Sequence, residues 1–142
     1  MPIDATGLDR FLEAQAPVWA QVVRELTAGR KATHWMWFVF PQLKGLGRTS
    51  TAQFYGIASR AEALAYWQHP ALGLRLKECA ELVLAAPSGL TAQNVLGSPD
   101  DMKLRSSMTL FAAVAPEESV FNGVLQRFYG GEPDPVTLAM LR

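Results

Sequence analysis

The residues with the chemistry to bind or transform a ligand gather in two segments of this 142-residue chain. The first, Thr33–Gln42, holds one of the two histidines, two of the four tryptophans and a glutamine. An imidazole can transfer protons near neutral pH, and an indole offers a flat apolar face with one N–H donor. We therefore take His34 as the candidate catalytic residue and Trp35, Trp37 and Gln42 as candidate ligand-binding residues.

The second segment is Pro99–Phe111, in which cationic and hydroxyl side chains crowd one expected helix. Lys103, Arg105 and Ser107 are the candidate groups to hold an anion such as a phosphate or a carboxylate. Lys103 and Ser107 are four residues apart and should share a face. Such a lysine can activate the serine hydroxyl as a nucleophile only if the lysine is neutral. The plainer alternative is a helical ion pair between Asp101 and Arg105, also four apart.

For His34 the plainer alternative is the more common one, an imidazole that bonds a backbone carbonyl inside an aromatic core. Metal ligation is not indicated, because two histidines and one cysteine far apart show no ligand spacing. The glycines of Lys44–Arg48 do not make a phosphate-binding loop. We expect no cofactor and no metal and, if the protein is an enzyme, a metal-independent hydrolase.

Charge is balanced in total but uneven along the chain. The net charge is zero, yet Leu26–Ala61 contains no acidic residue. This basic window surrounds the aromatic segment and indicates an anion nearby, although a solvated basic surface is the more common reason for such a run. A duplex-binding protein would usually have a basic total, which argues against nucleic acid as the partner. The cations of the window are Arg30, Lys31, Lys44, Arg48 and Arg60.

Apolar residues at three- and four-residue spacing predict helices along most of the chain. The first apolar stripe runs from Leu8 to Leu26, with a break near Ala16 because Pro17 cannot donate a helical hydrogen bond, and it ends at Gly29. Residues 34–40 favour strand by propensity. We nevertheless choose a short helix that stops at Pro41, since no strong strand is available to pair with it.

Capping residues mark the starts of the later helices. Ser59 and Glu62 form a capping box, Pro70 is expected as the first residue of the following helix, and His69 as a turn or capping residue. Ser98 should cap the helix that begins at Pro99, and Asp134 should cap the last one. The prediction is an all-α fold, residues 1–142, in a single domain of short and medium helices.

The single cysteine, Cys79, excludes an internal disulfide and is expected to be an inert buried thiol. The sequence lacks the pattern of a signal peptide. Its longest apolar run, Trp35–Phe40, is far shorter than the roughly 20 residues of a membrane-spanning helix. We therefore expect a cytoplasmic protein without a membrane partner; the oligomeric state is left open.

Five segments carry a recognisable pattern: Phe11–Gln15, Gly29–Lys31, Thr33–Gln42, His69–Leu76 and Pro99–Phe111. Together they resemble one family, the mainly bacterial domain of unknown function 1810. The likeness extends over nearly the whole chain and implies a single helical domain without an assigned activity. Some members carry the label calpastatin, which belongs to a disordered inhibitor and does not suit this apolar, capped sequence.

These observations lead to one main hypothesis and two alternatives. The main hypothesis is a pocket whose wall is made by His34, Trp35 and Trp37 and which binds or hydrolyses a nucleotide-like anionic small molecule held by Lys103 and its neighbours. The first alternative is a non-enzymatic protein–protein interaction module, because Trp and Arg dominate interfaces. The second is nucleic-acid binding through the basic window with aromatic stacking.

Overall fold

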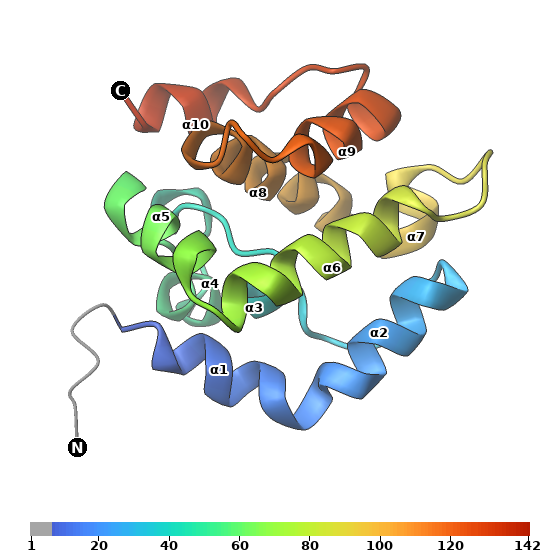
Figure 1. Ribbon diagram of the computed structural model, residues 1–142, viewed down its shortest axis with the longest axis horizontal. Coiled ribbons are helices and arrows are strands. Elements are labelled where there is room, and N and C mark those ends of the chain that lie inside the picture. The colour runs from blue at the N-terminus through green and yellow to red at the C-terminus, as the bar shows by residue number, and fades with distance from the viewer. Residues whose placement is uncertain (1–6) are drawn as a thin grey trace.

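The computed structural model describes residues 7–142, which fold almost entirely into helices (Figure 1). Within this range no strand forms, and the only sheet-like feature is an isolated parallel bridge between Leu43 and Ile57. The helices are α1 (Asp9–Gln15), η1 (Ala16–Val18), α2 (Trp19–Ala28), α3 (Met36–Val39), η2 (Lys44–Leu46), α4 (Ser50–Phe54), α5 (Arg60–Gln68), α6 (Leu72–Leu84), α7 (Ala92–Leu96), α8 (Asp100–Val114), α9 (Ser119–Tyr129) and α10 (Pro135–Met140). The all-α prediction is confirmed.

Helix α8 is the longest element and packs against α5, α7, α9 and α10. Leu104, Met108 and Phe111, the stripe that the sequence predicts, are completely buried. Around Phe111 the core is a chain of aromatic rings, with Tyr66 of α5 at 5.4 Å and Phe121 of α9 at 6.0 Å between ring centroids. In Figure 1, α1 and α2 form one end of the molecule, α9 and α10 the opposite end, and α6 crosses between them.

Most helices begin and end at or near the residues that the sequence predicts. The chain passes from α1 to α2 through the 3-10 turn η1, which contains Pro17, and α2 ends at Gly29 with a left-handed φ of 75°. Asp134 caps α10 by accepting a hydrogen bond from the Val136 N–H. The short helix predicted in residues 34–40 is present as α3.

Two predicted helix starts are wrong by one or two residues. Helix α6 begins at Leu72 and not at Pro70, because His69 Nδ1 accepts from the N–H groups of Ala71 and Leu72 and so caps the helix from outside. Helix α8 begins at Asp100, and Ser98 makes no capping hydrogen bond. The predicted turn or capping role of His69 is confirmed.

Two further predictions from the sequence concern Cys79 and membrane-spanning helices. Cys79 is completely buried, and burial raises the pKa of its thiol, which makes a reactive thiolate hard to form. Every helix in the described part of the chain is too short or too polar to cross a lipid bilayer.

Candidate functional site

Lys103 lies where the aromatic segment meets α8. Its ammonium is 5.3 Å from the centroid of the Trp37 ring, within the range of a cation–π interaction, and 3.7 Å from the Asp100 carboxylate. Its side chain stays partly exposed. The two segments that the sequence singled out therefore meet in space, although they are about 65 residues apart in the sequence.

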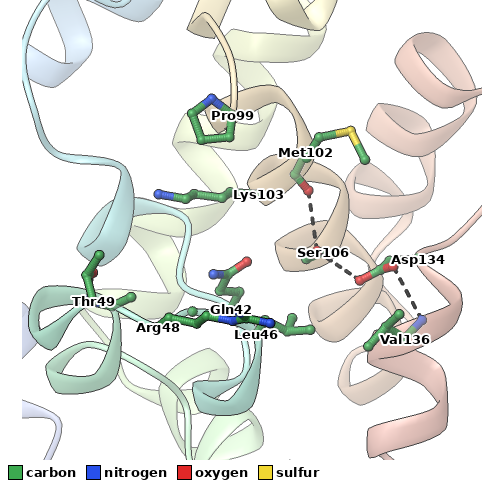
Figure 2. A pocket seen from close by; sticks show the side chains of 12 residues that line it. Gln42, Leu46, Arg48, Thr49, Pro99, Met102, Lys103, Ser106, Asp134 and Val136 are labelled. Atoms are coloured by element: carbon green, nitrogen blue, oxygen red, sulfur yellow. Dashed lines mark hydrogen bonds between the residues drawn. The ribbon is translucent and has the colours of Figure 1, made fainter.

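On one side of Lys103 is a hollow of about 370 Å³, which we call the Arg48 hollow. It is bounded by the segment before α4, by the first two turns of α8 and by the start of α10, and Lys103 projects across it in Figure 2. Its polar groups are an amide, two hydroxyls, a carboxylate and two cations. The lining residues are Gln42, Leu46, Gly47, Arg48, Thr49, Ala52, Pro99, Met102, Lys103, Ser106, Asp134 and Val136.

On the other side of Lys103 is a second hollow of about 400 Å³, which we call the His34 hollow. Here the Asp100 carboxylate lies 3.0 Å from the Lys31 ammonium, so that Asp100 links Lys31 to Lys103. The lining residues are Lys31, Ala32, His34, Met36, Trp37, Leu96, Ser98, Pro99, Asp100 and Lys103.

A small recess shares Gln42 and Lys103 with the lining of the Arg48 hollow, and Trp37 and Lys103 with that of the His34 hollow. Lys103 lines all three spaces, so we treat them as one feature, the Lys103 cleft. Of the seven residues predicted from the sequence, four line the cleft: His34, Trp37, Gln42 and Lys103.

The cations of the cleft differ in whether an acidic side chain is paired with them. Lys31 is almost covered and already paired with Asp100. Arg48 is exposed and makes no hydrogen bond, ion pair or ring contact with any residue of the described range. The Asp134 carboxylate lines the same hollow but forms no ion pair with Arg48, so within the described residues the guanidinium stays available to an anionic ligand.

His34 is also exposed and its imidazole makes no hydrogen bond within residues 7–142. The alternative in which it bonds a backbone carbonyl inside an aromatic core is therefore wrong. The imidazole is free to meet a ligand, but no second side chain orients it as a catalytic base is usually oriented.

Trp35 does not line the cleft, contrary to its predicted place in the pocket wall. It is 1% exposed, and its indole N–H donates to the carboxylate of Glu25 over 2.9 Å. The carboxylate also accepts from Gln21, from the Thr33 hydroxyl and from the N–H groups of Ala32 and Thr33. Burial alone would raise the pKa of Glu25, but these hydrogen bonds outweigh it and lower the pKa to about 2.

Arg105 and Ser107 also lie outside the cleft. Arg105 turns away from Asp101, its predicted partner, and donates to the backbone carbonyls of Glu132 and Pro133. Ser107 is completely buried in the core, and its hydroxyl has no hydrogen-bond partner within the described part of the chain. Ser107 was predicted to share a face of α8 with Lys103. One helical turn after Lys103, neighbouring helices cover that face.

Sequence reasoning did not place three polar residues that line the Arg48 hollow: Arg48 itself, Thr49 and Asp134. The Ser106 hydroxyl donates to Asp134 Oδ2 over 2.9 Å. A dashed line marks this hydrogen bond in Figure 2. Burial tends to raise the pKa of Asp134, but hydrogen bonds from Thr137, Ser106 and the backbone lower it overall. Arg48 could have been noticed as a member of the basic window, and Asp134 only as a helix cap.

In the described residues, His, Cys, Asp and Glu side chains do not come together in any group of three or more that could hold a metal ion. The polar groups that the cleft offers are cations, two carboxylates, hydroxyls, one amide and one imidazole.

Comparison with known proteins agrees with the resemblance noted in the sequence. The chain is similar to a solved structure, the conserved hypothetical protein Rv1873 from Mycobacterium tuberculosis, with 52% identity, a TM-score of 0.95, and coverage of 97% of this chain and 98% of that one. A search of curated proteins finds no match. The model of the family described as "Protein of unknown function (DUF1810)" matches residues 5–141, and the chain belongs to this family.

Proposed function

We propose that the Lys103 cleft binds a small anionic organic molecule of the nucleotide type. The observation that carries the proposal is the pair of cations in the Arg48 hollow: Lys103 lies across it, and Arg48 has no acidic partner in residues 7–142. A phosphate held between an ammonium and a guanidinium makes charge-assisted hydrogen bonds with both. The volume of about 370 Å³ is within the usual range for small-molecule sites.

The rest of the hollow suits the organic part of such a molecule. Apolar side chains, including Leu46, Met102 and Val136, provide much of its wall, and neutral polar groups of Gln42 and Thr49 stand among them. Ligand sites commonly combine apolar walls with a few polar groups that fix orientation. His34 lines the far side of Lys103, and a hydrolase activity at this cleft would depend on it for proton transfer.

The two alternatives receive less support from the arrangement of side chains. With Trp35 buried and Trp37 half-buried, the aromatic segment offers little surface to a protein partner. Nucleic-acid binding would use the five cations of the basic window, and two of them are already engaged, since Lys31 is paired with Asp100 and Arg60 donates to the Ala113 carbonyl. A small-molecule cleft is the function that these contacts favour.

The test is isothermal titration of the purified protein with the four ribonucleoside 5′-monophosphates. At least one should bind, and Arg48→Ala and Lys103→Ala should each weaken it roughly 10- to 100-fold, as expected for the loss of a hydrogen bond to a charged group. Lys44→Ala is the matched control, since Lys44 is an exposed cation outside the cleft and its removal changes the net charge equally.

Two results would contradict the proposal: no heat of binding with any of the four nucleotides at millimolar concentration, or equal affinities in the wild type, the two cleft variants and the control. His34→Ala addresses catalysis separately. If the bound nucleotide is hydrolysed, this variant should lose turnover and keep affinity.

A further inference from the structure

The position of Lys103 between two hollows raises the question of what the second hollow receives. The two spaces are similar in size, about 370 Å³ and 400 Å³, and each is large enough for one nucleoside-sized group. Lys103 and Pro99 line both of them. A molecule that filled both would have to pass the Lys103 ammonium at its middle.

The two hollows contain the same number of charged side chains but pair them differently. The Arg48 hollow adds to Lys103 a guanidinium that has no ion-pair partner in residues 7–142. Its carboxylate, that of Asp134, accepts hydrogen bonds from the hydroxyls of Ser106 and Thr137. In the His34 hollow the Asp100 carboxylate lies 3.0 Å from Lys31 and 3.7 Å from Lys103, so a protein carboxylate already neutralises the extra cation. A second anionic group there would have to compete with Asp100 for Lys31 and Lys103.

The remaining groups of the His34 hollow suit a neutral organic group. Trp37, Met36 and Leu96 provide apolar wall, and the Ser98 hydroxyl, the His34 imidazole and the Asp100 carboxylate can hydrogen-bond hydroxyls or amines. Asp100 in particular accepts hydrogen bonds and favours a ligand group that donates, such as a ribose hydroxyl.

We propose that the cleft recognises a dinucleotide-type ligand, in which two neutral nucleoside-like halves are joined by a phosphodiester or pyrophosphate bridge. The bridge lies at Lys103 on the side of Arg48, one half occupies the Arg48 hollow, and the other half occupies the His34 hollow. The basis for this assignment is that each hollow has apolar wall and hydrogen-bonding side chains, and that Arg48, in one of them, is a cation without an ion-pair partner in residues 7–142. The inference rests on the proposed function and adds the ligand class.

The probe is diadenosine pyrophosphate, compared by titration calorimetry with adenosine monophosphate, which contains one of its halves. In the wild type the dinucleotide should bind at least roughly tenfold more tightly, because its second half makes contacts without a further loss of translational freedom. Arg48→Ala and Lys103→Ala should weaken both ligands.

Two bulky substitutions then separate the hollows. Ala32 is exposed and lines the His34 hollow alone, so Ala32→Trp should reduce the affinity for the dinucleotide to that for the mononucleotide and leave the mononucleotide unaffected. Val136, 54% exposed, lines the Arg48 hollow alone, and Val136→Trp should weaken both ligands. Ala61→Trp, at an exposed site outside the cleft, is the control, and thermal melting verifies that each variant is folded.

The outcomes distinguish this inference from the proposed function. If adenosine monophosphate binds and depends on Arg48 and Lys103, but the dinucleotide binds no more tightly or Ala32→Trp leaves its advantage intact, the two-part ligand is refuted and the anion site stands. If neither the dinucleotide nor any mononucleotide binds, the proposed function fails and this inference fails with it.

Discussion

At the scale of single residues, Glu25 decides how the segment before α3 runs. Glu25 is only 5% exposed. Its carboxylate accepts hydrogen bonds from the N–H groups of Ala32 and Thr33 and from the Trp35 indole. Because the residues on both sides of His34 turn inward to this carboxylate, His34 itself is left facing solvent at the rim of the cleft. One acidic residue in α2 thereby positions both an indole in the core and an imidazole at the site.

Replacing Glu25 with Gln should make folding stability much less dependent on acid pH. The pKa of Glu25 is about 2 in the folded protein against 4.5 ordinarily, so the ionised form contributes stability above pH 4.5 that is lost as pH falls through 2. By linkage this contribution is about 3 kcal/mol. Urea unfolding of both proteins at pH 7 and pH 3 measures the larger part of it, about 2 kcal/mol.

The same experiment includes its control. Glu13→Gln removes an exposed acidic side chain and should leave the pH dependence close to that of the wild type. A Glu25→Gln protein whose free energy of unfolding falls between pH 7 and pH 3 as steeply as in the wild type would show that Glu25 is not the group responsible.

At the scale of elements, the junction between α5 and α6 depends on a close approach of two backbones. Gly73 lies in the first turn of α6, where a Cβ atom would come within 2.0 Å of the Trp67 carbonyl oxygen of α5. Only glycine leaves room for this contact. The His69 cap and Gly73 together allow the chain to reverse between the two helices within a few residues.

Gly73→Ala should therefore destabilise the protein by about 3 kcal/mol, since backbone has to move to accept the methyl group. Gly123→Ala in α9 is the contrasting substitution. Its Cβ would approach only the end of the flexible Leu84 side chain, at 3.2 Å, and alanine favours a helix interior by about 1 kcal/mol over glycine. In denaturant unfolding, Gly123→Ala should be within about 1 kcal/mol of the wild type, and comparable losses for the two variants would refute the close-approach argument.

At the scale of the whole molecule, α8 joins the core to the cleft and to the end of the chain. Leu104 and Met108 are buried in the core, Lys103 faces the cleft, and Arg105 reaches the segment before α10. Since Asp134 and Val136 at the start of α10 line the Arg48 hollow, holding this segment in place also completes the hollow.

Arg105→Ala should loosen the segment before α10 without removing a ligand contact. The two hydrogen bonds to the carbonyls of Glu132 and Pro133 are charge-assisted but partly exposed, so we expect a loss of about 1–2 kcal/mol. The ion pair with the exposed Glu132 adds little. Hydrogen exchange should accelerate in residues 132–141, and nucleotide affinity should fall far less than in Lys103→Ala.

A reduction of affinity in Arg105→Ala equal to that in Lys103→Ala, with unchanged exchange in residues 132–141, would instead support the direct ligand-binding role that the sequence suggested for Arg105.

Local patterns in the sequence determined the helices and most of their ends. Apolar spacing, Pro17, Gly29 and the Asp134 cap act over a few residues, so their effects can be read without knowing the fold. The main hypothesis placed the aromatic segment and Lys103 at one pocket, and four of the predicted site residues do line the cleft.

Only the tertiary structure decided which side of each element faces the cleft. Charged residues are rarely buried without partners, and nothing local shows that Glu25 gathers its donors from the loop after α2 and draws Trp35 inward. Likewise, Ser107 is covered and Ser106 exposed to the Arg48 hollow because neighbouring helices enclose α8 beyond its first two turns. Arg48 and Asp134 lie 86 positions apart in the sequence, and only the packing of α10 against α8 brings them to one hollow.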